Sequence, residues 1–208
     1  MRTTRTTAAA ALTLAVVLGL VACGNDGDAG GMPGMQHGTK STPSATTGTT
    51  SAAADHNDAD VKFATEMIPH HQQAVTMADL ALRKASNATV KQLATAIKAA
   101  QDPEIKQMSG WLTGWGEMVP TPGMGHEMAH GEGMMTEEEM AALGKAGGAA
   151  FDRMWVQLMI KHHQGAVAMA KTEQTAGKSS TAVALAKTIE TAQTAEIATM
   201  QKLLTQLP

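Results

Sequence analysis

Met-Ile-Pro-His-His-Gln-Gln-Ala-Val-Thr-Met, residues 67–77, returns 92 positions later as Met-Ile-Lys-His-His-Gln-Gly-Ala-Val-Ala-Met, residues 159–169. The same offset aligns nine residues of 93–112 with identical residues of 185–204, without a gap. Each half of the domain is therefore one copy of a unit that contains two segments.

Both segments of the unit have the periodicity of an amphipathic helix. In residues 60–84, apolar residues and histidines recur at alternating spacings of four and three, which gives two adjacent stripes on one face. A proline inside a helix removes a backbone donor, so the second helix could be split at Pro103. The four helices that we predict cover about 60–84, 87–117, 136–177 and 179–206.

The turns between the paired helices are short, near residues 85–87 and 177–179. Short turns require antiparallel neighbours, so each unit is predicted to be a helical hairpin, and two hairpins that bury their apolar faces against each other form a four-helix bundle. We therefore predict an all-α domain over residues 59–208. Its parts are repeat one at 59–117, a Gly/Pro-rich crossover at 118–135 and repeat two at 136–207.

The N-terminus has the features of a bacterial export signal. Two arginines precede a short apolar run, and Leu-Val-Ala-Cys at 20–23 looks like a lipobox, in which the cysteine is lipidated after cleavage. We expect residues 1–22 to be a lipoprotein signal peptide and Cys23 to carry the lipid. The protein would then be exported and anchored to the outer face of the cell membrane, or periplasmic. Residues 23–58, rich in small and polar residues, are predicted to be a flexible tether.

The composition excludes several classes of partner and function. The formal net charge is only -3 and no basic stripe is present, which argues against binding of nucleic acid. The sequence contains no recognisable nucleophile–base set or phosphate loop, so we do not expect an enzyme. Aromatic residues make up 2% of the chain, while it contains 16 methionines. Methionine therefore provides part of the packing of the core, or it has some other role.

Each member of the two His-His pairs lies on one of the apolar stripes, so all four imidazoles are expected to turn at least partly inward. Glu104 lies in the middle of the apolar face of its helix, and counting from the hairpin turn places its tip level with His70. A buried carboxylate needs a partner, because an isolated buried charge is costly. The same argument places Glu196 near the second pair, with Gln101 and Gln193 beside the two carboxylates.

Three interpretations of this layer are open. In the first, Glu–His hydrogen bonds satisfy a polar layer in a structural or interaction module, and the methionines only fill the core. In the second, the layer is a di-metal redox centre of the ferritin type. Too few carboxylates converge for such a centre, since Glu66 is replaced by Leu158 in the second copy. In the third, it binds a thiophilic or borderline ion, because imidazole suits copper and zinc and thioether selects Cu(I).

Methionine and histidine also crowd into the crossover, where there is no core for them to fill. A solvent-exposed methionine has no packing role, so this segment gives the strongest metal signal in the chain. A set of ligands without cysteine also suits an oxidising compartment. The candidate ligands in the crossover are Met124, His126, Met128 and His130.

The duplicated Met-Ile-x-His-His-Gln-x-Ala-Val element, with the later Gln-x-x-Glu-Ile-x-x-Met signature, resembles the secreted bacterial family catalogued as domain of unknown function family 305, over about residues 59–207. The resemblance implies a ferritin-like four-helix bundle, exported as a lipoprotein or periplasmic protein. It also implies similarity to periplasmic copper-binding proteins that protect against copper. The positions that match the family pattern are Met67, His70, His71, Met77, Met159, His162, His163 and Met169.

Together, the residues and the resemblance predict an exported, lipid-anchored protein that sequesters or carries copper, as Cu(I) or Cu(II), with silver or zinc as further candidates. We expect contact with the membrane through the lipid anchor only. Beyond the positions of the family pattern, the ligands predicted in the helices are Glu104, Glu196, Met108 and Met200.

Overall fold

The computed structural model describes residues 55–121 and 131–208, all of which belong to one compact unit. The predicted signal peptide, the lipidation site Cys23 and nearly all of the tether lie outside the described residues. So do the crossover ligands Met124, His126, Met128 and His130. Within the described ranges, no helix combines the length and the apolar character that crossing a membrane requires.

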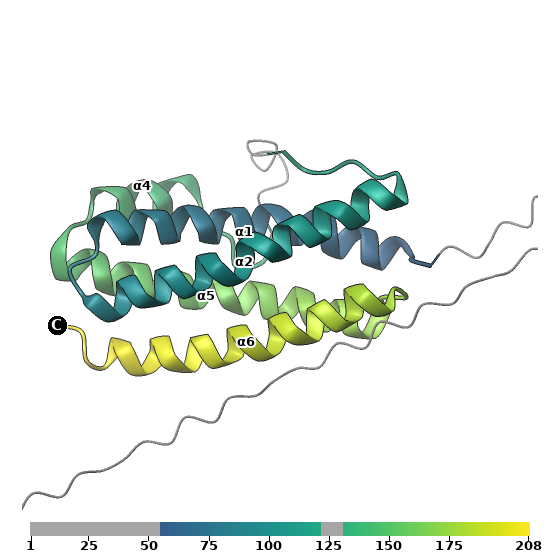
Figure 1. Ribbon diagram of the computed structural model, residues 1–208. Coiled ribbons are helices and arrows are strands. Elements are labelled where there is room, and N and C mark those ends of the chain that lie inside the picture. Colours follow the sequence, from purple (N-terminus) through teal and green to yellow (C-terminus); the bar gives the residue numbers. More distant parts are fainter. Residues whose placement is uncertain (1–54, 122–130) are drawn as a thin grey trace, which may run out of the picture. The chain divides into compact units, whose positions relative to one another are not determined.

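The described residues form helices and no strands (Figure 1). Two pairs of long helices form the two predicted hairpins, and a short helix follows the crossover. The helices are α1 (Asp58–Lys84), α2 (Ala88–Trp115), α4 (Glu137–Lys145), α5 (Gly148–Ala176) and α6 (Ser180–Leu204). The predicted all-α bundle of duplicated hairpins is confirmed.

The two hairpins pack mainly through their first helices. α2 packs along α1 and α6 packs along α5, while α1 and α5 pack against each other and join the hairpins. α4 lies against α5. The central pair α1 and α5 therefore contributes most to the interface between the two repeats.

Polar side chains cap the starts of α1, α2, α4 and α6. Asn57 and Thr136 each form a capping box with the residue three positions later, Asp60 and Glu139, at the starts of α1 and α4. Asn87 and Ser179 accept backbone N–H groups at the starts of α2 and α6, as expected for residues that follow the short turns.

One prediction about helix continuity was wrong, and one possible break does not occur. The third predicted helix is divided, because α4 ends at Lys145 and α5 begins only at Gly148, whose φ of 57° lies in the left-handed region that interrupts a helix. The second helix is not split at Pro103, which lies inside α2. Pro103 is on the exposed side of α2, while Gln101 and Met108 on either side of it are buried and hold the helix against the core.

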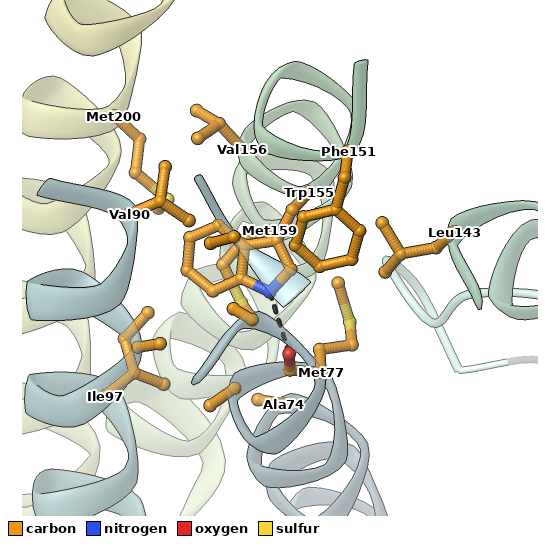
Figure 2. Close-up of a cluster of buried hydrophobic side chains, with 14 of the residues drawn as sticks. Ala74, Met77, Val90, Ile97, Leu143, Phe151, Trp155, Val156, Met159 and Met200 are labelled. Carbon is orange, nitrogen blue, oxygen red and sulfur yellow. Dashed lines mark hydrogen bonds between the residues drawn. The ribbon is translucent and has the colours of Figure 1, made fainter. Parts of the chain in front are cut away.

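Two apolar clusters form the core. One surrounds Trp155 and Phe151 and includes the methionines Met77, Met159 and Met200 (Figure 2). The indole Nε1 of Trp155 donates a hydrogen bond of 2.9 Å to the backbone oxygen of Met77, which ties α5 to α1 (Figure 2). The other cluster lies around Phe63 and includes Met67, Met108 and Leu112. The His-His pairs lie between the two clusters along both α1 and α5.

A pair of buried aspartates joins each hairpin to the turn of the other. Asp60 on α1 accepts the backbone N–H groups of Lys178 and Ser179, at 3.1 and 2.9 Å, in the turn between α5 and α6. Asp152 on α5 accepts those of Ser86 and Asn87, at 3.0 and 2.9 Å, in the turn between α1 and α2. The two aspartates are 92 positions apart, and so are the turns that they bind, so the duplication preserved this contact.

Replacement of Asp152 by alanine is expected to lower the free energy of unfolding by about 3 kcal/mol, because it leaves three partly buried donors of the turn without their charged acceptor. The carboxylate also accepts the hydroxyl of Ser86. Urea denaturation would measure the change. The control is Asp79→Ala, which removes a surface ion pair with Lys98 (3.2 Å) and is expected to cost less than about 1 kcal/mol. Equal losses in the two variants would contradict this interpretation.

Candidate metal centre

The four histidines of the duplicated element form one buried layer. The exposed fraction is 1% for His70 and 0% for His71, His162 and His163. His70 and His162 are equivalent positions of the two repeats, and their rings lie 3.8 Å apart between centroids at an angle of 43°. The local twofold axis that relates the repeats therefore passes between these two imidazoles.

The other histidine of each pair faces the second helix of its own hairpin. The Nε2 atom of His71 lies 2.8 Å from Oε2 of Glu104, and Nε2 of His163 lies 2.7 Å from Oε2 of Glu196. The predicted His/Glu layer is present, but the imidazole that meets Glu104 is His71 and not His70. Neighbouring helix positions point about 100° apart, so one histidine of the pair faces α2 and the other faces α5.

Most ring nitrogens of the layer have no hydrogen-bond partner. Both nitrogens of His70 and His162, and Nδ1 of His71 and His163, are buried and unpaired in the described structure. The backbone of Glu132 approaches His70, without a hydrogen bond that meets geometric criteria, and favours its protonated form. Since buried polar groups normally find partners, six unpaired nitrogens in one layer are unusual.

The central histidines carry no charge at neutral pH. Burial, together with the nearby His71 and His163, lowers the pKa of His70 to about 3. Burial, with the other three histidines, holds the pKa of His162 well below its ordinary value. A neutral imidazole keeps one nitrogen lone pair, which is the form that binds a metal ion.

The end of the crossover covers this layer. Gln73 on α1 bonds the backbone of Met135 through both of its side-chain atoms, at 2.7 and 3.0 Å. On α5 the equivalent position is Gly165, where a Cβ atom would lie 1.9 Å from the carbonyl oxygen of Glu132. Gly133, with φ of 85°, packs against the same glycine. Glutamine and glycine at equivalent positions thus hold one segment against both central helices.

The predicted methionine ligands are divided between the two apolar clusters. Met67, Met108 and Met169 lie in or against the cluster of Phe63, on one side of the histidine layer. On the other side, the cluster of Trp155 contains Met77, Met159 and Met200 (Figure 2). Packing accounts for the burial of these side chains, and coordination by them stays a prediction.

Glu66 and Lys161 are two further positions at which the repeats differ near the histidine pairs. Glu66 is exposed and pairs with Lys62, so it adds no carboxylate to the layer that a ferritin-type centre would need. Lys161, which replaces the proline of the first copy, pairs with Glu139 at 2.8 Å and ties α5 to α4. Among the residues that the structure describes, no three His, Asp or Glu side chains form a preformed metal cage.

Glu104 connects the layer to the surface. Its side chain is 16% exposed and borders a groove of about 490 Å³ between α2 and α6. Pro103 and Gln107 line the groove from α2, and Thr181 and Thr188 line it from α6. The Glu104 carboxylate therefore contacts both the groove and the fully buried His71.

Sequence reasoning missed the aspartate contacts and the glycine contact. The sequence does contain a sign of the contacts of Asp60 and Asp152, since both are acidic residues at equivalent positions on otherwise apolar helix faces. Gly165 had a signal in its difference from Gln73 within a repeat that otherwise matches closely. Its cause, the approach of Glu132, depends on the path of the crossover, which no periodicity encodes.

The chain matches the protein family described as domain of unknown function (DUF305) over residues 60–204, which includes both hairpins. The chain belongs to this family, as the resemblance in its sequence implied. No curated protein matches it.

Solved structures of the family have the same fold. A protein from Streptomyces coelicolor described as secreted is 34% identical, with a TM-score of 0.65 and coverage of 74% of this chain and 95% of that one. A fragment from Deinococcus radiodurans is also 34% identical, with a TM-score of 0.66 and coverage of 73% and 98%. CopM in a Cu(II)-bound form is 36% identical, with a TM-score of 0.61 and coverage of 71% and 96%. CopM structures also include Cu(I)-bound and silver-bound forms.

Gly165→Ala is expected to push Glu132 and Gly133 away from α5 and to lower the free energy of unfolding by about 1–3 kcal/mol, because backbone atoms fill the space of the new methyl group. Amide exchange at Met135, whose N–H is bonded by Gln73, would become faster. Gly144→Ala is the control, since nothing lies within 4 Å of a Cβ there and alanine favours the helix by about 0.5–1 kcal/mol. Unchanged exchange in Gly165→Ala would refute the contact.

The metal-free protein is expected to lose stability as the pH falls from about 6.5 toward 3. A pKa of about 3 for folded His70, against an ordinary value of 6.5, means that the unfolded chain binds the proton first. Each such histidine lowers the free energy of unfolding by up to about 1.4 kcal/mol per pH unit in this range. Denaturation of the protein and of His70→Gln, in chelator at several pH values, would measure the difference in slope. Equal slopes would contradict a buried neutral His70.

Proposed function

We propose that the protein binds copper outside the cytoplasm through its histidine layer and through the Met/His-rich crossover, and acts as a sequestering or carrier protein rather than an enzyme. The observation that carries this proposal is the set of unpaired ring nitrogens in a buried layer whose central imidazoles are neutral. Such nitrogens lack hydrogen-bond partners among the described residues, and a metal ion of suitable chemistry would supply one.

The geometry of the layer is compatible with an ion after small rearrangements. Two nitrogens bound to one metal ion lie within about 4 Å of each other, since each bond is about 2 Å long. The rings of His70 and His162 are already 3.8 Å apart between centroids. At the level of Glu104, His71 and its carboxylate partner offer a nitrogen and an oxygen next to the groove between α2 and α6. An ion that enters from this groove would meet Glu104 before the buried imidazole.

The choice of metal rests on ligand chemistry and on the relatives. Imidazole binds copper and zinc well, while thioether favours Cu(I) and silver. The candidate ligands of this chain combine the two groups and include no cysteine. CopM, 36% identical in its Cu(II)-bound form, has also been solved with Cu(I) and with silver. These points support copper first and silver second.

Export and lipid anchoring belong to the same proposal. The basic start, the apolar run and the lipobox-like Leu-Val-Ala-Cys support export with Cys23 as the lipidated residue. The family relative from Streptomyces coelicolor that is described as secreted supports export as well. An extracytoplasmic location is oxidising, which suits ligands that are not thiols.

One observation favours the structural alternative. His71 and His163 each have a carboxylate partner, as expected of a polar layer that only specifies the packing of the bundle. The two central histidines have no such partner, and hydrogen bonding alone does not explain them. Metal titration separates the two proposals.

The purified protein is expected to bind Cu(I) under reductant, and Cu(II) without it, more tightly than micromolar in at least one state, as measured by calorimetry and chelator competition. His70→Gln with His162→Gln is expected to remove the sites of the layer and leave those of the crossover. Changing Met124, His126, Met128 and His130 to Leu or Gln is expected to do the reverse. Weaker binding than micromolar in both states would end the copper proposal.

Methionine-to-leucine variants give a matched control for the helices. Leucine at Met67 and Met159 keeps the volume of the core nearly constant but removes the thioether. If these sulfurs are ligands, affinity for Cu(I) falls by at least about tenfold while the fold stays stable. If affinity stays the same, the imidazoles act without them.

A further inference from the structure

The two turns bound by Asp60 and Asp152 are equivalent in the duplication but are completed differently. At the turn between α1 and α2, Asp152 accepts two backbone N–H groups and also the hydroxyl of Ser86. The residue equivalent to Ser86 in the other turn is Lys178, which has no hydroxyl to offer. Asp60 also accepts the backbone N–H of Asn57 at 2.7 Å, so a side-chain donor equivalent to the Ser86 hydroxyl has to come from another residue.

Glu173 lies where such a donor is needed, next to Asp60. It is 1% exposed, and its carboxyl group faces that of Asp60 closely enough for the two groups to interact. Among the described residues, neither of its oxygens accepts a hydrogen bond from an N–H or hydroxyl group. The equivalent residue in repeat one is Ala81, beside the turn where Ser86 supplies the hydroxyl. Two carboxyl groups in contact form a hydrogen bond only when one of them keeps its proton, since two carboxylates are acceptors alone.

The chain also makes room for this glutamate. A Cβ atom at position 177 would lie 2.2 Å from Oε1 of Glu173, so only glycine fits there. The φ of Gly177 is -68°, an ordinary value, so the glycine is required for space and not for backbone conformation. In repeat one the equivalent residue is Ala85. Glu173 and Gly177 thus differ together from Ala81 and Ala85.

We propose that Glu173 is protonated in the folded protein and donates this proton to Asp60, so that the turn between α5 and α6 is fastened to α1 by a carboxyl–carboxylate hydrogen bond that is lost as the pH rises. The proton of the Glu173 carboxyl has the role that the Ser86 hydroxyl has in the other turn. When solution base removes the proton, two negative charges face each other in a buried contact. This device is independent of metal binding.

The electrostatics agree with this geometry. Burial raises the pKa of Glu173 to about 8, with added contributions from the hydrogen bond to Asp60 and its negative charge. Burial opposes ionisation of Asp60, but hydrogen bonds from Glu173 and from the N–H groups of Asn57, Ser179 and Lys178 lower its pKa overall. The proton is therefore on Glu173 and the charge on Asp60.

Other charged groups lie near this turn. At the start of α1, Asp55 pairs with His56 at 3.1 Å, and Asp55 and Asp58 are exposed. Asp60 is the acidic group on α1 that faces Glu173, and Lys178 is the charged residue of the turn itself. On α6, Glu190 pairs with Lys171 of α5 at 3.6 Å and accepts a hydrogen bond from Gln174. The acidic neighbour that acts on Glu173 is thus Asp60.

The pH dependence has a definite sign. The folded protein keeps a proton on Glu173 up to about pH 8, whereas the unfolded chain releases it near the ordinary value of 4.5. The contribution of this group to stability is therefore present below about pH 4.5 and lost as the pH rises to about 8. Relative to Glu173→Gln, which is neutral and donates its amide N–H to Asp60, the folding equilibrium constant of the wild type should fall by up to about tenfold per pH unit in this window.

Three measurements on the full chain test the proposal. Carbon NMR of the Glu173 side chain should give a titration midpoint well above that of an ordinary carboxyl group. Denaturation should show that Glu173→Gln is more stable than the wild type at pH 8. Amide exchange at Ser179, whose N–H is bonded to Asp60, should be faster in the wild type than in this variant at pH 9. Glu66→Gln, a change at an exposed carboxylate, should leave the pH dependence of the wild type in place.

Ser86→Ala provides the matched change at the other turn. It removes the hydroxyl bonded to Asp152 and should lower stability by the same factor at every pH between 5 and 9. A titration midpoint in the ordinary range for Glu173 would overturn the proposal. So would a wild-type stability that follows the concentration of Na⁺ or Ca²⁺ instead of pH, because a cation would then bridge two carboxylates.

Discussion

The packing of α1 against α5, across the contact of His70 with His162, determines the arrangement of the rest of the domain. Because these residues are equivalent in the duplication, an antiparallel pairing centred on them puts a twofold axis through the histidine layer. Residues at equivalent positions of the two hairpins are then placed to make paired contacts. Asp60 and Asp152 illustrate this consequence, since each reaches the turn of the other hairpin.

The crossover and α4 occur only once and break this symmetry. Two of the differences between the repeats lie where these single elements make contact. Gly165 admits the backbone of Glu132, and Lys161 pairs with Glu139 of α4. Differences from the repeated pattern therefore locate the path of the crossover over the central helices. They do not show that the second histidine pair has lost its role.

The sequence predicted the hairpins, the bundle and the presence of a His/Glu layer, because helical periodicity and turn length encode them directly. It did not predict that His71 rather than His70 meets Glu104, because both histidines lie on the apolar stripes and only the position of α5 decides between them. The break before Gly148 was missed because the Gly-Gly pair lies within an otherwise continuous helical pattern. Contacts of the crossover could not be predicted from the sequence, because they depend on the path that this segment takes over the central helices.

The energetics of the layer bear on its purpose. A buried polar group without a partner costs about 1–3 kcal/mol, so the six unpaired nitrogens oppose folding. The two apolar clusters on either side, which contain Trp155, Phe151 and Phe63, supply burial that offsets this cost. Bulky apolar residues at the positions of His70 and His162 would serve stability better. Both copies nevertheless keep His-His while the neighbouring positions 69 and 73 differ from 161 and 165. A layer kept for packing alone would have no reason to retain unpaired imidazoles in both copies, whereas a ligand that pairs with them gives both copies the same reason.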